Sequence, residues 1–281
     1  MRDLVTTEWL ARHLDDPALR IVDVRWYLDP ARKGRDAYAA GHVPGAVFLD
    51  VDADLSAPGG GRGRPAGRHP WPSAEQVSRV MSGAGIGPGT RVVAYDDQGG
   101  AVAARLWFLL RAYGHDDVAV LDGGIPKWKA EGRPLTTEVP AVAPATFDAR
   151  LRPGFVLTKA DLRQRDPARP LLDARAAERY RGESEPIDPR AGHIPGARSA
   201  PFSGNLAGGP LPVFLPPAEL RKRYAALGAE DEAPVVYCGS GITACHDLLA
   251  LHLAGLPGSL YAGSWSEWSA DPALPVETGE G

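Results

Sequence analysis

Short, uninterrupted runs of apolar residues alternate along this chain with longer segments whose apolar positions are three and four apart. Two of the longer segments, 101–113 and 244–254, carry leucines at this helical spacing. Short continuous runs are typical of parallel strands that are buried on both faces of a sheet. The pattern therefore predicts an α/β fold in which strands and helices alternate. The predicted strands are 21–24, 47–49, 92–95, 118–121, 171–172 and 235–237.

The chain contains an internal repeat. The sequence Ile-Val-Asp-Val-Arg at 21–25 corresponds to Leu-Leu-Asp-Ala-Arg at 171–175, and Gly-His-Val-Pro-Gly-Ala at 41–46 corresponds to Gly-His-Ile-Pro-Gly-Ala at 192–197. The copies lie roughly 140 to 150 positions apart, which suits a duplicated domain rather than a solenoid unit of about 20 to 50 residues. Because these segments recur in both copies, we expect them to have structural rather than catalytic roles.

A stretch rich in Pro and Ala separates the two copies. Residues 139–156 lack both helical and alternating periodicity, so we expect them to form a linker. This divides the chain into an amino-terminal domain, 1–138, and a carboxy-terminal domain, 157–281. Each domain is predicted to hold a mostly parallel sheet that is flanked by helices.

Composition and charge narrow the function classes. The 281 residues include 31 Lys and Arg against 35 Asp and Glu, which gives a formal net charge of −4. The chain therefore lacks the basic excess that binding to a nucleic-acid backbone requires. No apolar run approaches the roughly 20 residues of a spanning helix, so we expect no membrane partner. Two cysteines cannot form a secreted disulfide framework, which favours a cytoplasmic location.

The strongest candidate for chemistry is the segment after the last predicted strand. Cys238 begins a Gly-rich loop, Cys-Gly-Ser-Gly-Ile-Thr, which leads into a predicted helix. In open parallel sheets, ligands bind at the carboxyl ends of strands, beside helix amino termini whose N–H groups attract anions. Gly239 and Gly241 allow several N–H groups to converge, and Ser240 or Thr243 can cap the helix. The loop is thus predicted to cradle an anion held by Cys238.

Other interpretations of the cysteines are open from the residues alone. Cys238 is as easily a buried small apolar side chain, although the equivalent position of the first copy, Asp96, has no thiol. Cys245 lies two helical turns further on, roughly 10 Å away, and is expected in the core. A cysteine phosphatase would need an arginine six positions after the cysteine, where this chain has Ala244. The cysteines and histidines show no metal-ligand spacing, so no metal is expected.

Taken together, the duplicated unit, the paired Gly-His-(Val/Ile)-Pro-Gly-Ala segments and the Cys238 loop resemble the two-domain rhodanese sulfurtransferases. The resemblance covers roughly residues 3–276. It implies two tandem rhodanese-like α/β domains, a first copy without catalytic function, and a second copy in which Cys238 carries a persulfide. It also implies that no cofactor is required. The neutral Gly239 and Ser240 after the cysteine resemble the loop of enzymes that use 3-mercaptopyruvate.

The same resemblance assigns roles to further residues. Ser240, His69 and Asp52 match a proposed Ser-His-Asp relay, which could move a proton as the carbon–sulfur bond of the donor breaks. Without the resemblance, His69 would be interpreted as a solvated loop histidine. The loop residues predicted to contact the donor are Gly239, Gly241, Ile242 and Thr243.

The resemblance further implies that arginines bind the acidic group of the donor. Arg179 matches a family arginine whose planar guanidinium suits a carboxylate or a sulfonate. A second arginine is expected nine positions later, where this chain has Asp188. Arg190 is the nearest substitute, so Arg179 and Arg190 are the predicted donor-binding cations. A surface location is the alternative for either side chain.

Three functions are compatible with the sequence. The first is transfer of sulfur from 3-mercaptopyruvate, or more slowly from thiosulfate, through a Cys238 persulfide to cyanide, a thiol or thioredoxin. The second is a thiosulfate–cyanide sulfurtransferase. The third is a binding or regulatory module without enzymatic activity, which the intact Cys238 loop disfavours. In each case we expect the protein to be a monomer.

Overall fold

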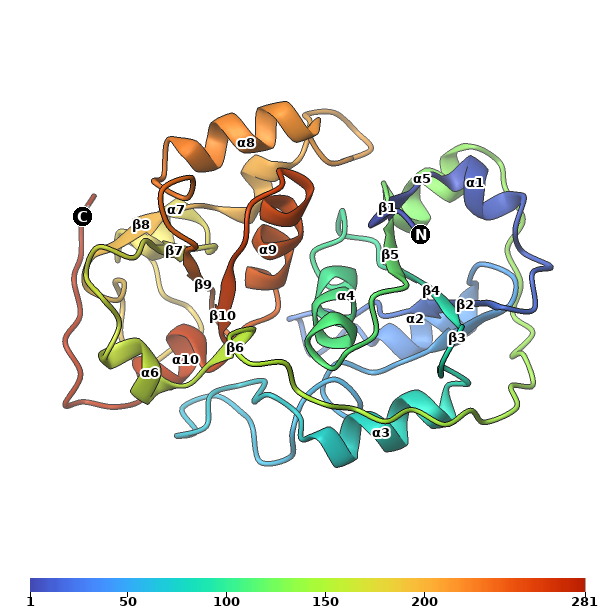
Figure 1. Ribbon diagram of the computed structural model, residues 1–281, viewed down its shortest axis with the longest axis horizontal. Helices are drawn as coiled ribbons and strands as arrows, with labels where there is room; N and C mark the ends of the chain where they lie inside the picture. Colours follow the sequence, from blue (N-terminus) through green and yellow to red (C-terminus); the bar gives the residue numbers. More distant parts are fainter. Residues whose placement is uncertain (281) are drawn as a thin grey trace. The chain divides into compact units, whose positions relative to one another are not determined.

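Two five-stranded parallel sheets organise the chain, which the computed structural model describes over residues 1–280 (Figure 1). Each sheet belongs to its own unit. The first unit comprises Met1–Leu55, Pro72–Arg152 and Gly208–Phe214, and the second comprises Ser56–Trp71, Pro153–Ala207 and the chain from Leu215 onward. The predicted limits of 1–138 and 157–281 do not anticipate this exchange, in which each half of the sequence contributes a short segment to the other unit.

Strands and helices alternate along the first unit. Its sheet has the order β1-β5-β4-β2-β3, and every pair of neighbouring strands is parallel. The elements are β1 (Leu4–Val5), α1 (Thr7–Ala11), β2 (Leu19–Asp23), α2 (Gly34–Ala40), β3 (Ala46–Phe48), α3 (Ala74–Gly83), β4 (Arg91–Tyr95), α4 (Ala103–Ala112), β5 (Val118–Leu121) and α5 (Gly124–Ala130).

The second unit repeats this order with one addition, a 3₁₀ helix after its third strand. Its parallel sheet runs β6-β10-β9-β7-β8. The elements are β6 (Val156–Leu157), α6 (Lys159–Arg163), β7 (Leu171–Asp173), α7 (Ala177–Tyr180), β8 (Ala197–Ser199), the 3₁₀ helix η1 (Phe202–Asn205), α8 (Pro217–Ala225), β9 (Val235–Tyr237), α9 (Ala244–Leu253), β10 (Ser259–Tyr261) and α10 (Ser264–Trp268). The prediction of two α/β domains with mostly parallel sheets is confirmed.

Apolar side chains leave the strands on both faces of each sheet. In β4, Val93 and Tyr95 join the core that also contains Trp128 of α5. Val92 and Ala94 alternate with them and are equally buried on the opposite face, where α4 packs against the strand. Because both faces are covered, such a strand is a continuous apolar run in the sequence, which is the pattern that predicted it.

The repeated Asp-Arg pair is a structural element of each unit. Arg25 forms an ion pair with Asp23 at 2.6 Å, and Arg175 does so with Asp173 at 2.6 Å. Each guanidinium also donates to the glycine carbonyl of the Gly-His-(Val/Ile)-Pro-Gly-Ala segment, at 2.9 Å and 2.7 Å respectively. All four side chains are buried. The expected structural role of both repeated segments is therefore confirmed.

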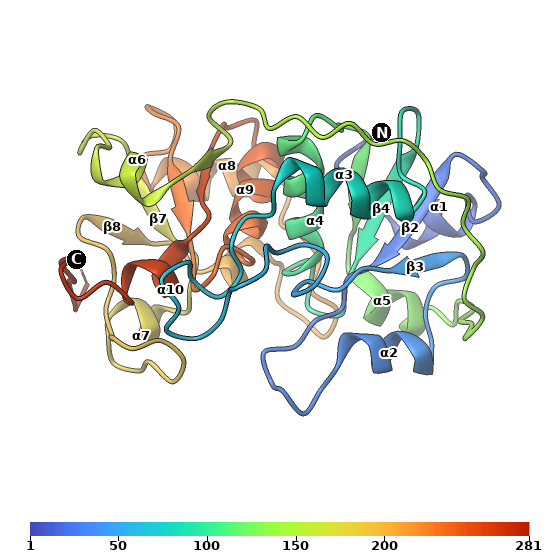
Figure 2. The ribbon, with the colours of Figure 1, turned by 90° about the horizontal axis from the view of Figure 1, so that it is seen from below.

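The predicted linker follows the surface of the first unit. It has no helix or strand before β6, and Figure 2 shows it running along α3. The N–H of Phe147 donates to Ser82 Oγ at 2.9 Å, and the N–H of Ala149 donates to Ser78 Oγ at 3.0 Å, with both serines on α3. Two partly buried serines of α3 thus satisfy backbone groups that the linker cannot pair by itself.

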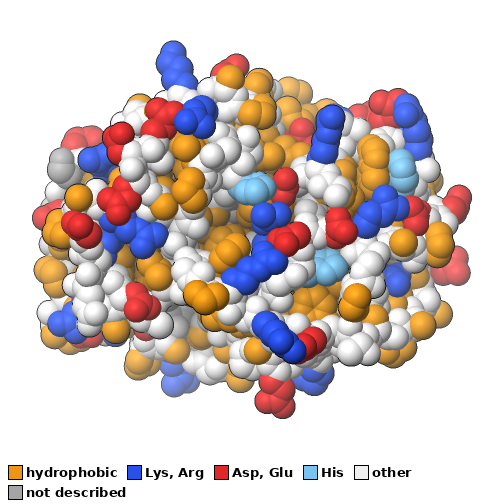
Figure 3. All heavy atoms as spheres, viewed as in Figure 1, with side chains coloured by type: hydrophobic (Ala, Val, Ile, Leu, Met, Phe, Trp, Pro, Cys, Tyr) orange, Lys and Arg blue, Asp and Glu red, His pale blue; other side chains and the backbone are white. Residues whose placement is uncertain are grey.

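None of the helices within residues 1–280 has both the length and the apolar character needed to cross a bilayer. On the face shown in Figure 3, acidic and basic side chains are interspersed. This distribution accords with a chain whose charged residues nearly balance.

Candidate active site

Cys238 lies at the carboxyl end of β9, at the start of the loop that leads into α9. The residue is 2% exposed. The backbone N–H of Gly241 donates to Cys238 Sγ at 3.1 Å, and Gly241 has a left-handed φ of 77°, a conformation that glycine adopts without strain. The loop therefore turns one N–H group toward the sulfur, and the convergence of several N–H groups on an anion there stays a prediction.

The start of α9 differs from the sequence prediction in one respect. Thr243 occupies the N-cap position, but its side chain makes no capping hydrogen bond. Ser240 instead contacts His69 through its hydroxyl group. The prediction that one of these side chains caps the helix was wrong. Cys245 is buried in α9, and its thiol donates to the Gly241 carbonyl at 3.3 Å, which confirms its core position.

Ser264 holds the backbone of Cys238 from the neighbouring strand end. Its Oγ accepts a hydrogen bond from the N–H of Cys238 at 3.2 Å and donates to the Tyr261 carbonyl at 3.0 Å. The N–H of Trp265 donates to the Cys238 carbonyl at 2.9 Å. Ser264 has a φ of 54°, and it is the one non-glycine residue with positive φ within residues 1–280. Backbone strain of this kind is concentrated at functional sites.

The equivalent loop of the first unit shows what such a loop does with an anion. Asp96 follows β4 as Cys238 follows β9, and its carboxylate is fully buried. It accepts hydrogen bonds of 2.7 to 3.0 Å from four backbone N–H groups, those of Gln98, Gly100, Val102 and Ala103. Burial raises the pKa of Asp96, and the four hydrogen bonds oppose that shift. The first copy therefore fills its own cradle with a side chain.

A loop from the first half of the sequence brings His69 to the second unit. His69 Nδ1 lies 2.7 Å from Ser240 Oγ, and both side chains are buried. The N–H of Arg68 donates to Ser266 Oγ at 3.0 Å, which fixes the loop beside α10. Gly67 meets the same hydroxyl closely, because a β-carbon there would lie 2.9 Å from Ser266 Oγ. The solvated-loop interpretation of His69 was therefore wrong.

Asp52, the third predicted relay residue, belongs to the first unit. There its carboxylate accepts a hydrogen bond of 3.0 Å from the Trp26 indole N–H. The part of Asp52 in a relay stays a prediction. Of the other loop residues, Ile242 is buried, and its carbonyl accepts a hydrogen bond from the N–H of Cys245.

Arg179 is one of several charged side chains near the Cys238 loop. It contacts Glu185 at 2.7 Å and Asp188 at 3.1 Å. Its Nη1 lies 3.5 Å from the place where a β-carbon on Gly239 would be. A glycine at position 239 thus allows the guanidinium to approach the residue directly after Cys238.

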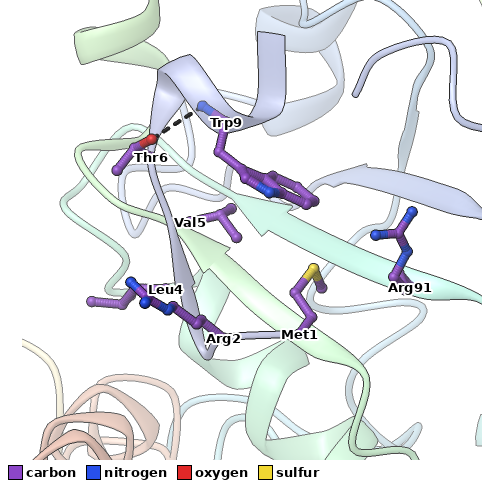
Figure 4. Close-up of a pocket in the computed structure, with 7 residues that line it drawn as sticks. All are labelled: Met1, Arg2, Leu4, Val5, Thr6, Trp9 and Arg91. Carbon is purple, nitrogen blue, oxygen red and sulfur yellow. Dashed lines mark hydrogen bonds between the residues drawn. The ribbon is translucent and has the colours of Figure 1, made fainter. Parts of the chain in front are cut away.

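The pocket beside β1 offers no thiol nucleophile or acid for such chemistry. The pocket in Figure 4 lies beside β1, and its lining contains no cysteine, histidine or carboxylate side chain. Within residues 1–280, no three His, Cys, Asp or Glu side chains are grouped so that they could hold a metal ion.

Comparison with known proteins gives the family. The model of the rhodanese-like domain matches twice, at residues 6–131 and 157–271. The chain belongs to the rhodanese family. It is 46% identical to a Pseudomonas aeruginosa protein named as a probable 3-mercaptopyruvate sulfurtransferase, with 99% of this chain and 98% of that protein covered. It is also 39% identical to SseB from Mycobacterium tuberculosis, which is named as a putative thiosulfate sulfurtransferase, with 98% of this chain and 97% of that protein covered.

A solved structure of the rhodanese family has the same fold as this chain. SseA from Escherichia coli, described as a 3-mercaptopyruvate sulfurtransferase, has a TM-score of 0.82 and 31% sequence identity. The similarity covers 94% of this chain and 99% of SseA. This rhodanese is therefore an enzyme of the sulfurtransferase class.

In this rhodanese, the arginines near the Cys238 loop are not the pair that the sequence suggested. Arg190 was expected near the donor, but its guanidinium donates to four backbone carbonyls around the end of α10, at 2.6 to 3.0 Å. Arg68 was not predicted, yet its Nη2 lies 2.6 Å from the place of a β-carbon on Gly239. Its position next to His69 in the sequence was the available signal.

Proposed function

We propose that this rhodanese transfers the sulfur of 3-mercaptopyruvate to a thiophilic acceptor through a persulfide on Cys238. The observation that carries the proposal is the Gly241 N–H directed at Cys238 Sγ, at the carboxyl end of a parallel strand. Anionic sulfur is the nucleophile in sulfur transfer, and backbone N–H groups stabilise it in place. The names of the relatives support the same chemistry.

The reaction proceeds in two displacements. The Cys238 thiolate attacks the sulfur of 3-mercaptopyruvate, an S–S bond forms, and the electron pair of the breaking C–S bond passes to the carbon. The proton of the donor thiol ends on that carbon, so that pyruvate leaves and Cys238 carries an anionic persulfide. A nucleophile such as cyanide or a thiolate then attacks the outer sulfur, and the Cys238 thiolate is restored.

The proton transfer in the first displacement has a suitable carrier. The Ser240 hydroxyl and the His69 imidazole are 2.7 Å apart and buried, so a proton can pass between them without water. We propose that Asp52 completes this relay. Arg179 supplies a guanidinium for the donor carboxylate.

Thiosulfate is the second candidate donor. Its two negative charges call for more cations than the site provides, because Glu185 and Asp188 already pair with Arg179. We therefore expect kcat/KM to be higher for 3-mercaptopyruvate than for thiosulfate. Steady-state kinetics with both donors and cyanide as acceptor measure this, and a higher kcat/KM for thiosulfate would overturn the donor assignment.

The sulfur acceptors, the cellular location and the oligomeric state of the enzyme are inferred from the sequence alone. We propose small thiols or thioredoxin as acceptors, a cytoplasmic location, and activity as a monomer. A binding module without activity is the remaining alternative, and the absence of sulfur on Cys238 after treatment with donor would favour it.

A further inference from the structure

Two guanidinium groups approach Gly239 from distant parts of the sequence. Arg68 comes from the loop that carries His69, and Arg179 comes from α7. Their nearest nitrogen atoms lie 2.6 Å and 3.5 Å from the place where a β-carbon on Gly239 would be. The residue directly after Cys238 is thus open to both cations, and any side chain at position 239 would displace Arg68.

Asp188 connects these two cations. One carboxylate oxygen, Oδ1, contacts Arg68 Nη1, and the other, Oδ2, lies 3.1 Å from Arg179 Nη2. Burial raises the pKa of Asp188 and lowers that of Arg68, while the attraction between the two charges opposes both shifts. The position at which a second donor-binding arginine was expected therefore holds an acid that fixes an arginine from another segment.

Arg68 keeps hydrogen-bonding capacity for a ligand. Its side chain is 8% exposed, and its buried Nε has no hydrogen-bond partner within residues 1–280. The same is true of the buried Nε of Arg179. A buried N–H group without an acceptor destabilises the folded protein. A donor carboxylate that accepts a hydrogen bond from such a group removes this cost, and binding becomes more favourable.

On the basis of the proposed function, we propose that Arg68 is the second donor-binding cation and that Asp188 selects donors with a single charge. Asp188 positions Arg68 and also lowers the net positive charge over Gly239. A donor with one carboxylate is attracted by two guanidinium groups. For a dianion such as thiosulfate, the attraction by the guanidinium groups and the repulsion by Asp188 both double, because the Coulomb energy scales with charge, so the Asp188 carboxylate removes part of the advantage that a second negative charge would otherwise gain.

The first test separates binding from chemistry in Arg68→Gln. We expect the KM for 3-mercaptopyruvate to rise about tenfold or more while kcat changes by less than about threefold, since a ground-state contact is lost. Arg62→Gln, an exposed arginine of the same loop, is the matched control and should keep the wild-type KM. An unchanged KM in a folded Arg68→Gln variant overturns the proposal.

A conservative variant keeps this test decisive if Arg68→Gln does not fold. Arg68→Lys retains the charge but loses the planar fork, so the KM should rise by a smaller factor of about three. A wild-type KM in Arg68→Lys would then overturn the proposal in the same way.

The second test concerns selectivity. Asp188→Asn removes the negative charge, and we expect the ratio of kcat/KM for thiosulfate to that for 3-mercaptopyruvate to rise at least about threefold. An unchanged ratio contradicts the selective role of Asp188. Failure of the proposed function is seen separately, because the wild-type enzyme would then place no sulfur from 3-mercaptopyruvate on Cys238.

Discussion

At the scale of single residues, the site depends on side chains that fix the backbone of Cys238. Ser264 does so at the expense of a left-handed φ of 54°, which non-glycine residues adopt at a cost of about 1 kcal/mol or more. Its hydroxyl accepts from the N–H of Cys238 and donates to the Tyr261 carbonyl. The side chain thus compensates for the strained backbone and positions the nucleophile.

This position predicts an uncommon combination of effects for Ser264→Gly. Glycine relieves the strain but removes the hydroxyl, so we expect the melting temperature to change little while the rate of persulfide formation falls about tenfold or more. Stopped-flow measurement of single-turnover loading checks the rate, and calorimetry checks the stability. Wild-type loading would show that Ser264 does not position Cys238.

Several residue roles were accessible from the sequence and others were not. Cys238 and Gly241 could be predicted because a strand, a glycine loop and a helix follow one another within a few positions. Arg68 was missed although it precedes His69, since its contacts with Asp188 depend on which unit its loop joins. Arg190 was assigned by proximity in sequence, whereas its direction is set by the carbonyls at the end of α10.

At the scale of elements, the continuous apolar pattern identified the central strands β2, β4, β5, β7 and β9, because they are covered on both faces, and it also identified the edge strand β3. It missed the central strand β10, whose three residues begin with a serine. The edge strands β1 and β6 have two residues each and therefore carry too little pattern to be recognised. The helix α9 was predicted from its leucines, but its buried polar residues were not. Its Asp247 is fully buried and accepts a hydrogen bond of 2.6 Å from Asn205 Nδ2.

Asp247 makes the stability of the second unit depend on pH. Burial raises its pKa to about 7, whereas an aspartate in an unfolded chain titrates near about 4. The folded state therefore holds more protons between these values. The contribution of Asp247 to stability is fully present below about pH 4 and is lost as the pH rises through about 7.

We expect Asp247→Asn to remove this dependence. Between pH 4 and 7, the melting temperature of the wild type should fall relative to that of the variant, and the difference should level off above about pH 7. The exposed Asp231→Asn is the matched control and should give a curve parallel to the wild type. Parallel curves for Asp247→Asn and the wild type would contradict the assignment.

At the scale of the whole molecule, the two copies of the fold differ in the residue that follows the strand at the equivalent loop. The second copy has a cysteine in its loop, and the first has Asp96, whose carboxylate satisfies four backbone N–H groups. The repeat was visible in the sequence, as was the difference between Cys238 and Asp96. The exchange of residues 56–71 and 208–214 between the units was not, because it follows from tertiary contacts that leave no periodic signal.

The first copy is predicted to need Asp96 for stability and not for chemistry. Asp96→Ala leaves four buried N–H groups without acceptors, and at about 1 to 3 kcal/mol for each unsatisfied group the loss should exceed about 3 kcal/mol. Asp96→Asn keeps an acceptor and should lose less. Thermal unfolding measures both variants, and equal stability of Asp96→Ala and the wild type would exclude the cradle role.

The central claim, that Cys238 carries the transferred sulfur, is tested most directly by intact-protein mass spectrometry after treatment with 3-mercaptopyruvate and no acceptor. The wild type should gain the mass of one sulfur atom on Cys238 and lose it again when cyanide is added. Cys238→Ser should fold, as judged by its melting temperature, and gain nothing, while a variant at Cys245 should still load. A wild-type protein that turns over donor without this gain, or a Cys238→Ser variant that remains active, would contradict the account.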